Sequence, residues 1–200
     1  MVPTTVRFVI PLVFPVIFFV FTIVIIFVAS QATTKKKQAL QRLVSVLPGT
    51  IPRFSLMPAF NGQYQGLPIS IMLISGGEHS PERLKIELKK NTLFKLKIYA
   101  ENPLTLFGER LGIIREVLTG DELFDRQFLI FSDKPQHARA YFANSSMKEA
   151  LRRLFNRGFD SFVANGRKIV IYKPNYNMED LESSRVVVSL QDLLLLVRGM

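Results

Sequence analysis

A run of 22 uncharged residues near the start of the chain restricts its folding more than any other feature. Residues 8–29 carry no charged side chain and are rich in Val, Ile and Phe. About 20 apolar residues cross the hydrocarbon core of a bilayer as a helix, which satisfies its own backbone hydrogen bonds there. Pro11 and Pro15 lie in the first third, so we expect the helix to begin late or to kink. The sequence therefore predicts a single transmembrane anchor within residues 1–30.

The competing interpretation is a cleaved signal peptide that ends at the small residues 28–30. The apolar run is longer than the roughly 7–15 residues of a signal-peptide core, and Arg7 is the one charged residue before it. We therefore favour an anchor that stays in the mature protein.

The flanking charges predict how this anchor is oriented. One side carries Arg7 and the α-amino group, and the other carries a larger basic cluster of Lys35, Lys36, Lys37 and Arg42. Loops rich in Lys and Arg stay in the cytoplasm. We therefore expect a single-pass protein of the cell membrane with its N-terminus outside and its C-terminal domain in the cytoplasm.

Residues 31–58 are predicted to form an amphipathic juxtamembrane helix followed by a proline-rich linker. Leu40, Leu43, Val44 and Leu47 have the i, i+3, i+4, i+7 spacing of one helix face. This stripe is more typical of packing on the protein's own domain than of a lipid-surface or coiled-coil role. Three prolines follow, at positions 48, 52 and 58, and suggest a spacer.

Residues 59–200 have the pattern of a soluble α+β domain, with antiparallel β-hairpins and helices packed on one face. The apolar run 128–131 is typical of a strand covered on both faces. Ser146 and Glu149 have capping-box spacing before an amphipathic stretch. Asn165-Gly166 is a strong hairpin signal, Asp133 is a candidate helix cap, and a last helix is expected within residues 178–197.

Two alternating segments, residues 83–89 and 94–98, predict a hairpin of their own. A three-residue loop at 90–92 would set Leu88 opposite Phe94 and keep the apolar side chains on one face. Apart from Glu87, the other face would be basic, with Arg83, Lys85, Lys89, Lys95 and Lys97. Such a face is most often solvated and blunts edge pairing. The alternative, together with Lys35, Lys36 and Lys37, is a docking surface for anionic lipid or an acidic partner.

The sequence offers little catalytic chemistry. It has no Cys, and its two histidines, His79 and His137, have no second histidine or spaced carboxylate to complete a metal set. Nucleotide-binding glycine motifs and a serine-hydrolase elbow are absent. We therefore expect no cofactor, no metal and no enzymatic activity. The net charge of +10 is spread along the chain without a known motif, so we expect no nucleic-acid partner.

A cluster of carboxylates at residues 121–125 allows two interpretations. It could hold Mg²⁺ or Ca²⁺, or supply an acid and a base. We favour a structural turn in which a glycine frees the backbone, one aspartate bonds its own chain, another pairs with Arg126 or caps, and two aromatic rings enter the core. The residues of this turn are Gly120, Asp121, Phe124, Asp125 and Phe128.

The same motif carries a resemblance to known proteins. Tyr64-x-Gly66-x-Pro68, then Thr119-Gly120-Asp121-x-x-Phe124-Asp125-Arg126-x-Phe128, then Ser132-Asp133 before a helix, resembles a group of uncharacterised bacterial membrane-associated domains. The resemblance covers roughly residues 60–200. It implies a single α+β domain and assigns no activity and no catalytic residue.

Three hypotheses for function follow. The first is a non-catalytic, membrane-anchored accessory subunit of a membrane complex, with membrane lipid and another membrane protein or a second copy of itself as partners. The second is a module that binds anionic membrane surfaces, in which each Lys or Arg contributes on the order of 1 kcal/mol. The third is an enzyme acting on a membrane-associated substrate, with Asp121, Asp125 and His137 as candidates.

Overall fold

The computed structural model describes residues 18–24, 34–52, 57–77, 80–100 and 116–200. Most of the predicted span 8–29 lies outside these residues, and so does His79. Among the residues that the structure does describe, no helix combines the length and the apolar character needed to cross a bilayer.

Eight strands form one antiparallel sheet in the order β1-β2-β3-β4-β8-β7-β5-β6. The described elements, in chain order after a helix over residues 34–44, are β1 (Gly49–Thr50), β2 (Ala59–Tyr64), β3 (Leu67–Ile74), β4 (Arg83–Lys89), β5 (Leu96–Ala100), α3 (Glu122–Asp125), β6 (Phe128–Ser132), α4 (Pro135–Phe142), α5 (Ser145–Asn156), β7 (Ser161–Ala164), β8 (Lys168–Pro174), a 3₁₀ turn η1 (Met178–Leu181) and α6 (Ser183–Arg198). The chain is thus an α+β protein with an antiparallel sheet, as the sequence predicts.

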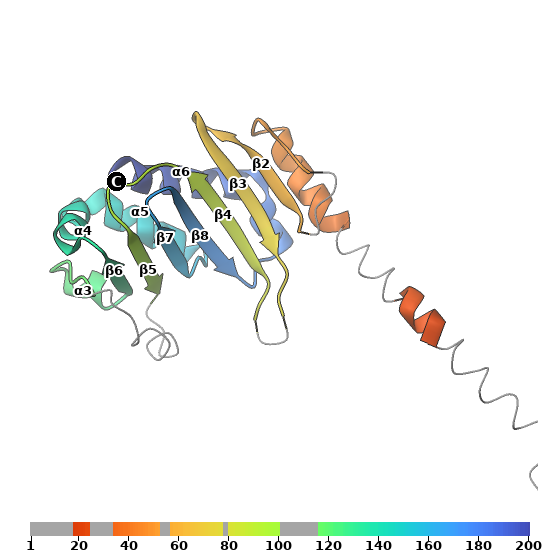
Figure 1. Ribbon diagram of the computed structural model, residues 1–200, viewed down its shortest axis with the longest axis horizontal. Helices are drawn as coiled ribbons and strands as arrows, with labels where there is room; N and C mark the ends of the chain where they lie inside the picture. Colours follow the sequence, from red (N-terminus) through yellow and green to blue (C-terminus); the bar gives the residue numbers. More distant parts are fainter. Residues whose placement is uncertain (1–17, 25–33, 53–56, 78–79, 101–115) are drawn as a thin grey trace, which may run out of the picture.

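One face of the sheet forms the core. A single row of directly paired residues crosses seven strands, and every side chain in it is at most 1% exposed: Phe60, Ile71, Ile86, Ile171, Phe162, Ile98 and Ile130. Figure 1 shows α5 and α6 lying across this face, behind the strands. Alternation along each strand places every second side chain against these helices.

The predicted pairing of residues 83–89 with 94–98 is wrong. β4 pairs with β3 on one side and β8 on the other, whereas β5 pairs with β6 and β7. Leu88 therefore lies opposite Ile69 and Ile169 instead of Phe94.

The β7–β8 hairpin occupies the space between β4 and β5, and the intervening residues pass over its tip. Crossing three strand spacings needs about 14 Å, and six extended residues span roughly 20 Å. The backbone N–H of Thr92 donates to the carbonyl of Gly166 in the β7–β8 turn, at 3.0 Å. The connection is therefore a short crossover fixed to the hairpin that separates the two strands.

The 34–44 helix packs on the domain, as its leucine stripe predicts. Leu40 and Leu43 are fully buried, and Leu47 is 3% exposed, all three in the same core as the sheet. Val44 is 43% exposed, so it lies at the margin of the stripe. β1 then pairs with β2. The core of the domain therefore includes residues from 34–50, which precede the predicted domain start at residue 59.

Of the turn and helix caps predicted from short sequence motifs, the turn is confirmed and the two caps are wrong. Asn165-Gly166 forms the predicted β7–β8 turn, with Gly166 at a φ of 92°. Helix α5 is capped by Asn144, whose side chain accepts from the Ser146 N–H, so the predicted Ser146–Glu149 box is wrong. The Asp133 carboxylate does not cap α4 but accepts the backbone N–H of Lys95 at 2.7 Å, which fixes the start of β5 to the end of β6.

Candidate docking face

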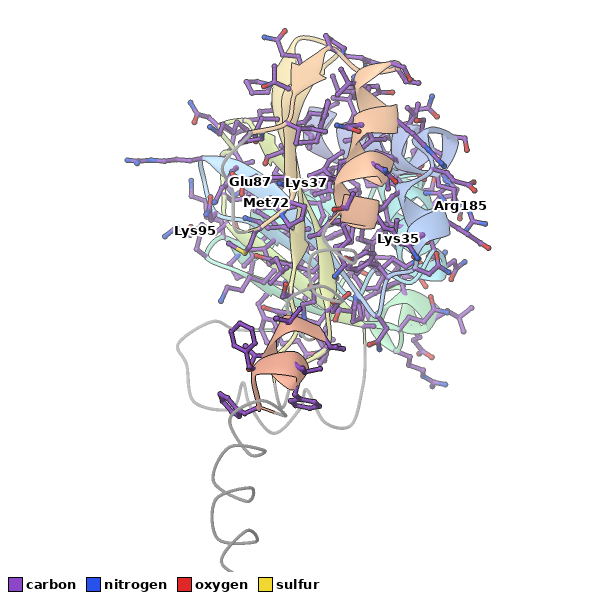
Figure 2. All side chains as sticks on the ribbon, turned by 90° about the vertical axis from the view of Figure 1, so that its right-hand side faces the viewer. Lys35, Lys37, Met72, Glu87, Lys95 and Arg185 are labelled. Carbon is purple, nitrogen blue, oxygen red and sulfur yellow. The ribbon has the colours of Figure 1, made fainter. Side chains whose placement is uncertain are left out.

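The sheet face opposite the helices, here called the open face, has no helix across it among the described residues (Figure 1). Its central row runs through Ser70, Glu87, Val170, Val163, Lys97 and Phe131, which are paired in that order across six strands. Figure 2 turns the molecule by 90° and places Glu87, Met72 and Lys95 on one side and Arg185 on the other. The open face and the helix-covered face are therefore distinct surfaces.

The open face carries apolar side chains between its charged ones. Val170 is 4% exposed and Leu129 is 7% exposed, yet neither belongs to the main core cluster. The Tyr99 and Phe131 rings meet edge to face, with centroids 6.4 Å apart. Residues 128–131 were predicted to be buried on both faces of their strand. Phe128 and Ile130 pack in the core, and Leu129 and Phe131 lie on the open face. Exposed sheet faces of antiparallel proteins are usually polar, and Val163 and Phe131 remain partly exposed on this one, which makes it a candidate docking surface.

Glu87 lies near the centre of the open face and is 6% exposed. Its carboxylate Oε2 lies 2.7 Å from the Lys85 ammonium and 3.1 Å from that of Lys168. Burial alone would raise the pKa of Glu87, but the hydrogen bonds and charges of Lys85 and Lys168 outweigh it and hold the pKa below its ordinary value. The sequence alone did not reveal this pairing with Lys168, which is 81 residues away.

Replacing Glu87 with glutamine should lower stability in a pH-dependent way. Because its folded-state pKa is depressed, the stabilisation from Glu87 is complete above the ordinary glutamate pKa and is lost as pH falls through the folded-state value. We expect Glu87→Gln to cost about 1–2 kcal/mol near pH 7, and the gap to shrink below pH ~4. Denaturant unfolding of both proteins between pH 7 and pH 3 measures it. A gap that is constant with pH would contradict the ion-pair account.

The predicted basic residues divide into two groups. Arg83, Lys85, Lys89 and Lys97 lie on the open face, and the exposed Lys95 adjoins it at the start of β5. They share a face without forming a hairpin, because β8 and β7 stand between the two strands. Lys168, on β8, joins the same surface, opposite Lys89; the sequence placed residues 168–172 in a hairpin but gave no face for them.

The lysines of the 34–44 helix do not join this surface as a group. Side chains two residues apart on a helix are separated by about 200° around its axis, so Lys35 and Lys37 point to opposite sides (Figure 2). Lys36 pairs with Glu82 at 2.6 Å, and its ammonium lies over the Tyr176 ring, 5.9 Å from the centroid. Although burial opposes it, the Glu82 hydrogen bond raises the pKa of Lys36. Lys36 therefore holds the 34–44 helix on the domain.

A hollow of 510 Å³ opens at the β5–β6–β7 end of this region. It is mostly apolar, with Phe131, Val163, Ala164 and Pro135 in its lining. Its polar lining residues are Lys95, Lys97, Ser132, Asp133 and Asn165. This volume lies in the range of sites that bury ligands or side chains of a partner.

The motif at residues 120–128 is a structural turn, as predicted. Gly120 has a φ of 84°, and Asp121 caps α3 by accepting the Phe124 N–H. Phe124 is fully buried and Phe128 is 5% exposed. Asp125 differs from the expectation, because its carboxylate accepts from the Thr119 and Gly120 N–H groups and the Thr119 hydroxyl instead of pairing with Arg126.

The candidate catalytic groups are engaged in other contacts. The Lys148 hydrogen bond, at 2.9 Å, lowers the pKa of Asp121. Asp125 holds its own turn, and His137 is exposed on α4 with its ring 6.2 Å from that of Phe94. No described contact joins the histidine to either carboxylate. Across the described part of the chain, no group of three His, Asp or Glu residues is arranged to hold a metal.

Comparison with known proteins identifies a fold but no family. No protein-family model and no curated protein matches the chain. The crystal structure of the mycobacterial trehalose monomycolate transport factor A, TtfA, is similar, with a TM-score of 0.57 at 12% identity. The match covers 83% of this chain and 96% of that one. At this identity the likeness concerns the fold alone.

Proposed function

We propose that this protein is a non-catalytic, membrane-anchored accessory component of a membrane protein complex, and that its domain binds a partner protein through the open face. The observation that carries the proposal is a sheet that buries a full core on one side and presents apolar side chains and lysines on the other. Interfaces of this kind combine an apolar centre with a charged rim.

The N-terminal sequence supports the anchor. The apolar run 8–29 is long enough to span a bilayer, and its described part is a helix over residues 18–24. Three phenylalanines in that helix, Phe18, Phe19 and Phe21, are 72%, 67% and 63% exposed, which suits a lipid environment better than water. With the basic cluster at Lys35–Lys37 on the cytoplasmic side, the domain would face the cytosol.

The likeness to a transport factor adds modest support. TtfA is, by its name, a factor in trehalose monomycolate transport, and an accessory role in membrane transport would suit a protein of this fold. Fold similarity at this level does not transfer substrate or partner, so the proposal leaves both unassigned.

An anionic membrane surface is the alternative partner, and the exposed Lys89 and Lys95 favour it. Three of the cations near this surface and the anchor, Lys36, Lys85 and Lys168, are instead paired with Glu82 or Glu87. This pairing lowers the positive charge that lipid headgroups would meet. A protein partner is therefore the better fit.

Native mass spectrometry after mild extraction tests the proposal. We expect the full-length protein, extracted from its own membranes in several mild detergents, to be recovered with a second membrane protein at a fixed ratio. Stable, specific protein interfaces bury about 1,200–2,000 Å² in total, and a partner held in this way should remain bound in mild detergent. Recovery as a monomer in every detergent would contradict the proposal, and recovery with lipid alone would favour the alternative.

A further inference from the structure

The lysines at the hollow beside the open face differ from those near Glu87 because no described carboxylate pairs with them. Lys85 and Lys168 share the carboxylate of Glu87, whereas no described ion pair engages Lys95 or Lys97. Asp133 is the one carboxylate in the described lining, and one of its oxygens already accepts the Lys95 backbone N–H. The hollow therefore combines apolar lining residues with two lysines that no described ion pair engages.

The shape of the hollow restricts what can fill it. Val163 and Phe131 are partly buried in its lining, so a ligand must reach into the hollow to contact them. A side chain projecting from a peptide segment can do so, whereas a flat bilayer surface would meet the rim first. A side chain buried in a pocket at the centre of an interface is the common form of a binding hot spot.

The charge of the chain argues against a second copy as the occupant. The full sequence carries a net charge of +10, and two basic surfaces repel each other when they meet. The ammonium groups of Lys95 and Lys97 instead complement carboxylates.

We infer that the hollow receives an apolar side chain from an acidic segment of the partner protein, with carboxylates next to that side chain pairing with Lys95 and Lys97. This inference rests on the proposed function and specifies the partner's chemistry. The apolar contact supplies affinity and the two lysines supply selectivity for an acidic segment.

Site-specific photo-crosslinking in native membranes tests this inference. A photoreactive amino acid is placed at Val163 of the full-length protein, with a second probe at Phe131 in case the first impairs folding. The control probe is at Val188, which is 40% exposed on α6 and lies on the helix-covered side. We expect the open-face probes to crosslink to a segment of another protein with several Asp or Glu residues near the crosslink, and the Val188 probe not to reach that segment.

Charge-reversal variants test whether the two lysines contribute to the crosslink. Lys97→Glu and Lys95→Glu should each lower the crosslink yield from Val163 about tenfold or more, because they set like charges opposite each other. Arg126→Glu, a reversal of equal size at a side chain that is 77% exposed on another surface, should leave the yield unchanged.

Each other outcome overturns the inference. Crosslinks to lipid, to a second copy of this chain or to a segment without carboxylates would do so, as would an equal effect of all three reversals. If mild extraction recovers a partner but neither open-face probe crosslinks to it, this inference and docking through the open face are both wrong, while the accessory role stands. If extraction recovers no partner, the proposed function itself fails.

Discussion

A fragment that begins at residue 59 should be unstable, whereas one that begins at residue 34 should fold as a soluble domain. The shorter fragment loses Leu40, Leu43 and Leu47, each at most 3% exposed. Burying a leucine contributes about 1.5–3 kcal/mol, so the three together approach the roughly 5–15 kcal/mol that stabilises a whole domain. Thermal unfolding followed by circular dichroism measures the difference.

Two further contacts disappear from the shorter fragment. The Lys36–Glu82 ion pair and the bond from the Ser183 hydroxyl to the Arg42 carbonyl, at 3.2 Å, both tie the 34–44 helix to distant parts of the domain. The matched control is Val44→Ala in the longer fragment, which should have little effect because that side chain is 43% exposed. Equal unfolding temperatures for the two fragments would show that the helix contributes little to stability.

Replacing Asp192 with alanine should cost roughly 2–4 kcal/mol of unfolding free energy. The carboxylate is 8% exposed on α6 and accepts from Arg153 at 2.6 Å and from Arg157 at 2.6 Å, both on or next to α5. Without it, Arg157 loses its described carboxylate partner, and Arg153 keeps only the exposed Glu149. We expect a cost at or below that of a fully buried pair, because both arginines reach solvent.

Glu149→Ala is the control for this prediction. Glu149 also contacts Arg153, at 3.6 Å, but its side chain is 58% exposed and the pair lies within one helix. Such pairs contribute roughly 0.3–0.5 kcal/mol. Denaturant unfolding of the two variants compares them. A loss for Asp192→Ala as small as that for Glu149→Ala would mean that the α5–α6 interface does not depend on this network.

Alternation along the chain was sufficient to predict which side chains face the core, but not which strands are neighbours. Ile86 and Ile98 were assigned to the same face, and they do lie in one row of the sheet. Their separation by two strands depends on the β7–β8 hairpin, which is about 70 residues further along the chain. Pairing is a long-range choice, and the local pattern of β4 suits β5, β8 or β3 equally well.

The predicted turns at residues 120–128 and 165–166 are confirmed, because their contacts join residues close together in the chain. The bond of Asp121 to Phe124, for example, joins residues three positions apart. The contact made by Lys36, in contrast, is long-range and was not predicted. It was predicted to meet lipid or a partner, but its carboxylate partner, Glu82, is 46 residues away and could not be foreseen.

The apolar residues of the open face were predicted to lie in strands, but the sequence did not predict that they share one surface. The run 128–131 indicated a strand covered on both sides, and in β6 both faces are largely buried, with Phe131 left partly exposed on the open face. The apolar residues Val163 and Val170 were assigned to a hairpin without a face. Recognising the second surface requires the strand order, because the row Val170–Val163–Lys97–Phe131 exists only in the folded sheet.

Protection of a single cysteine on the open face tests the central claim most directly. The chain has no natural cysteine, so Val163→Cys and Glu149→Cys each supply one labelling site, on the open face and on α5 respectively. The rate of maleimide labelling is compared in opened native membranes and after detergent has dissociated the complex. We predict that Val163→Cys is protected in the membranes and reactive after dissociation, while Glu149→Cys reacts equally in both. Equal reactivity of Val163→Cys in the two conditions would contradict docking through the open face.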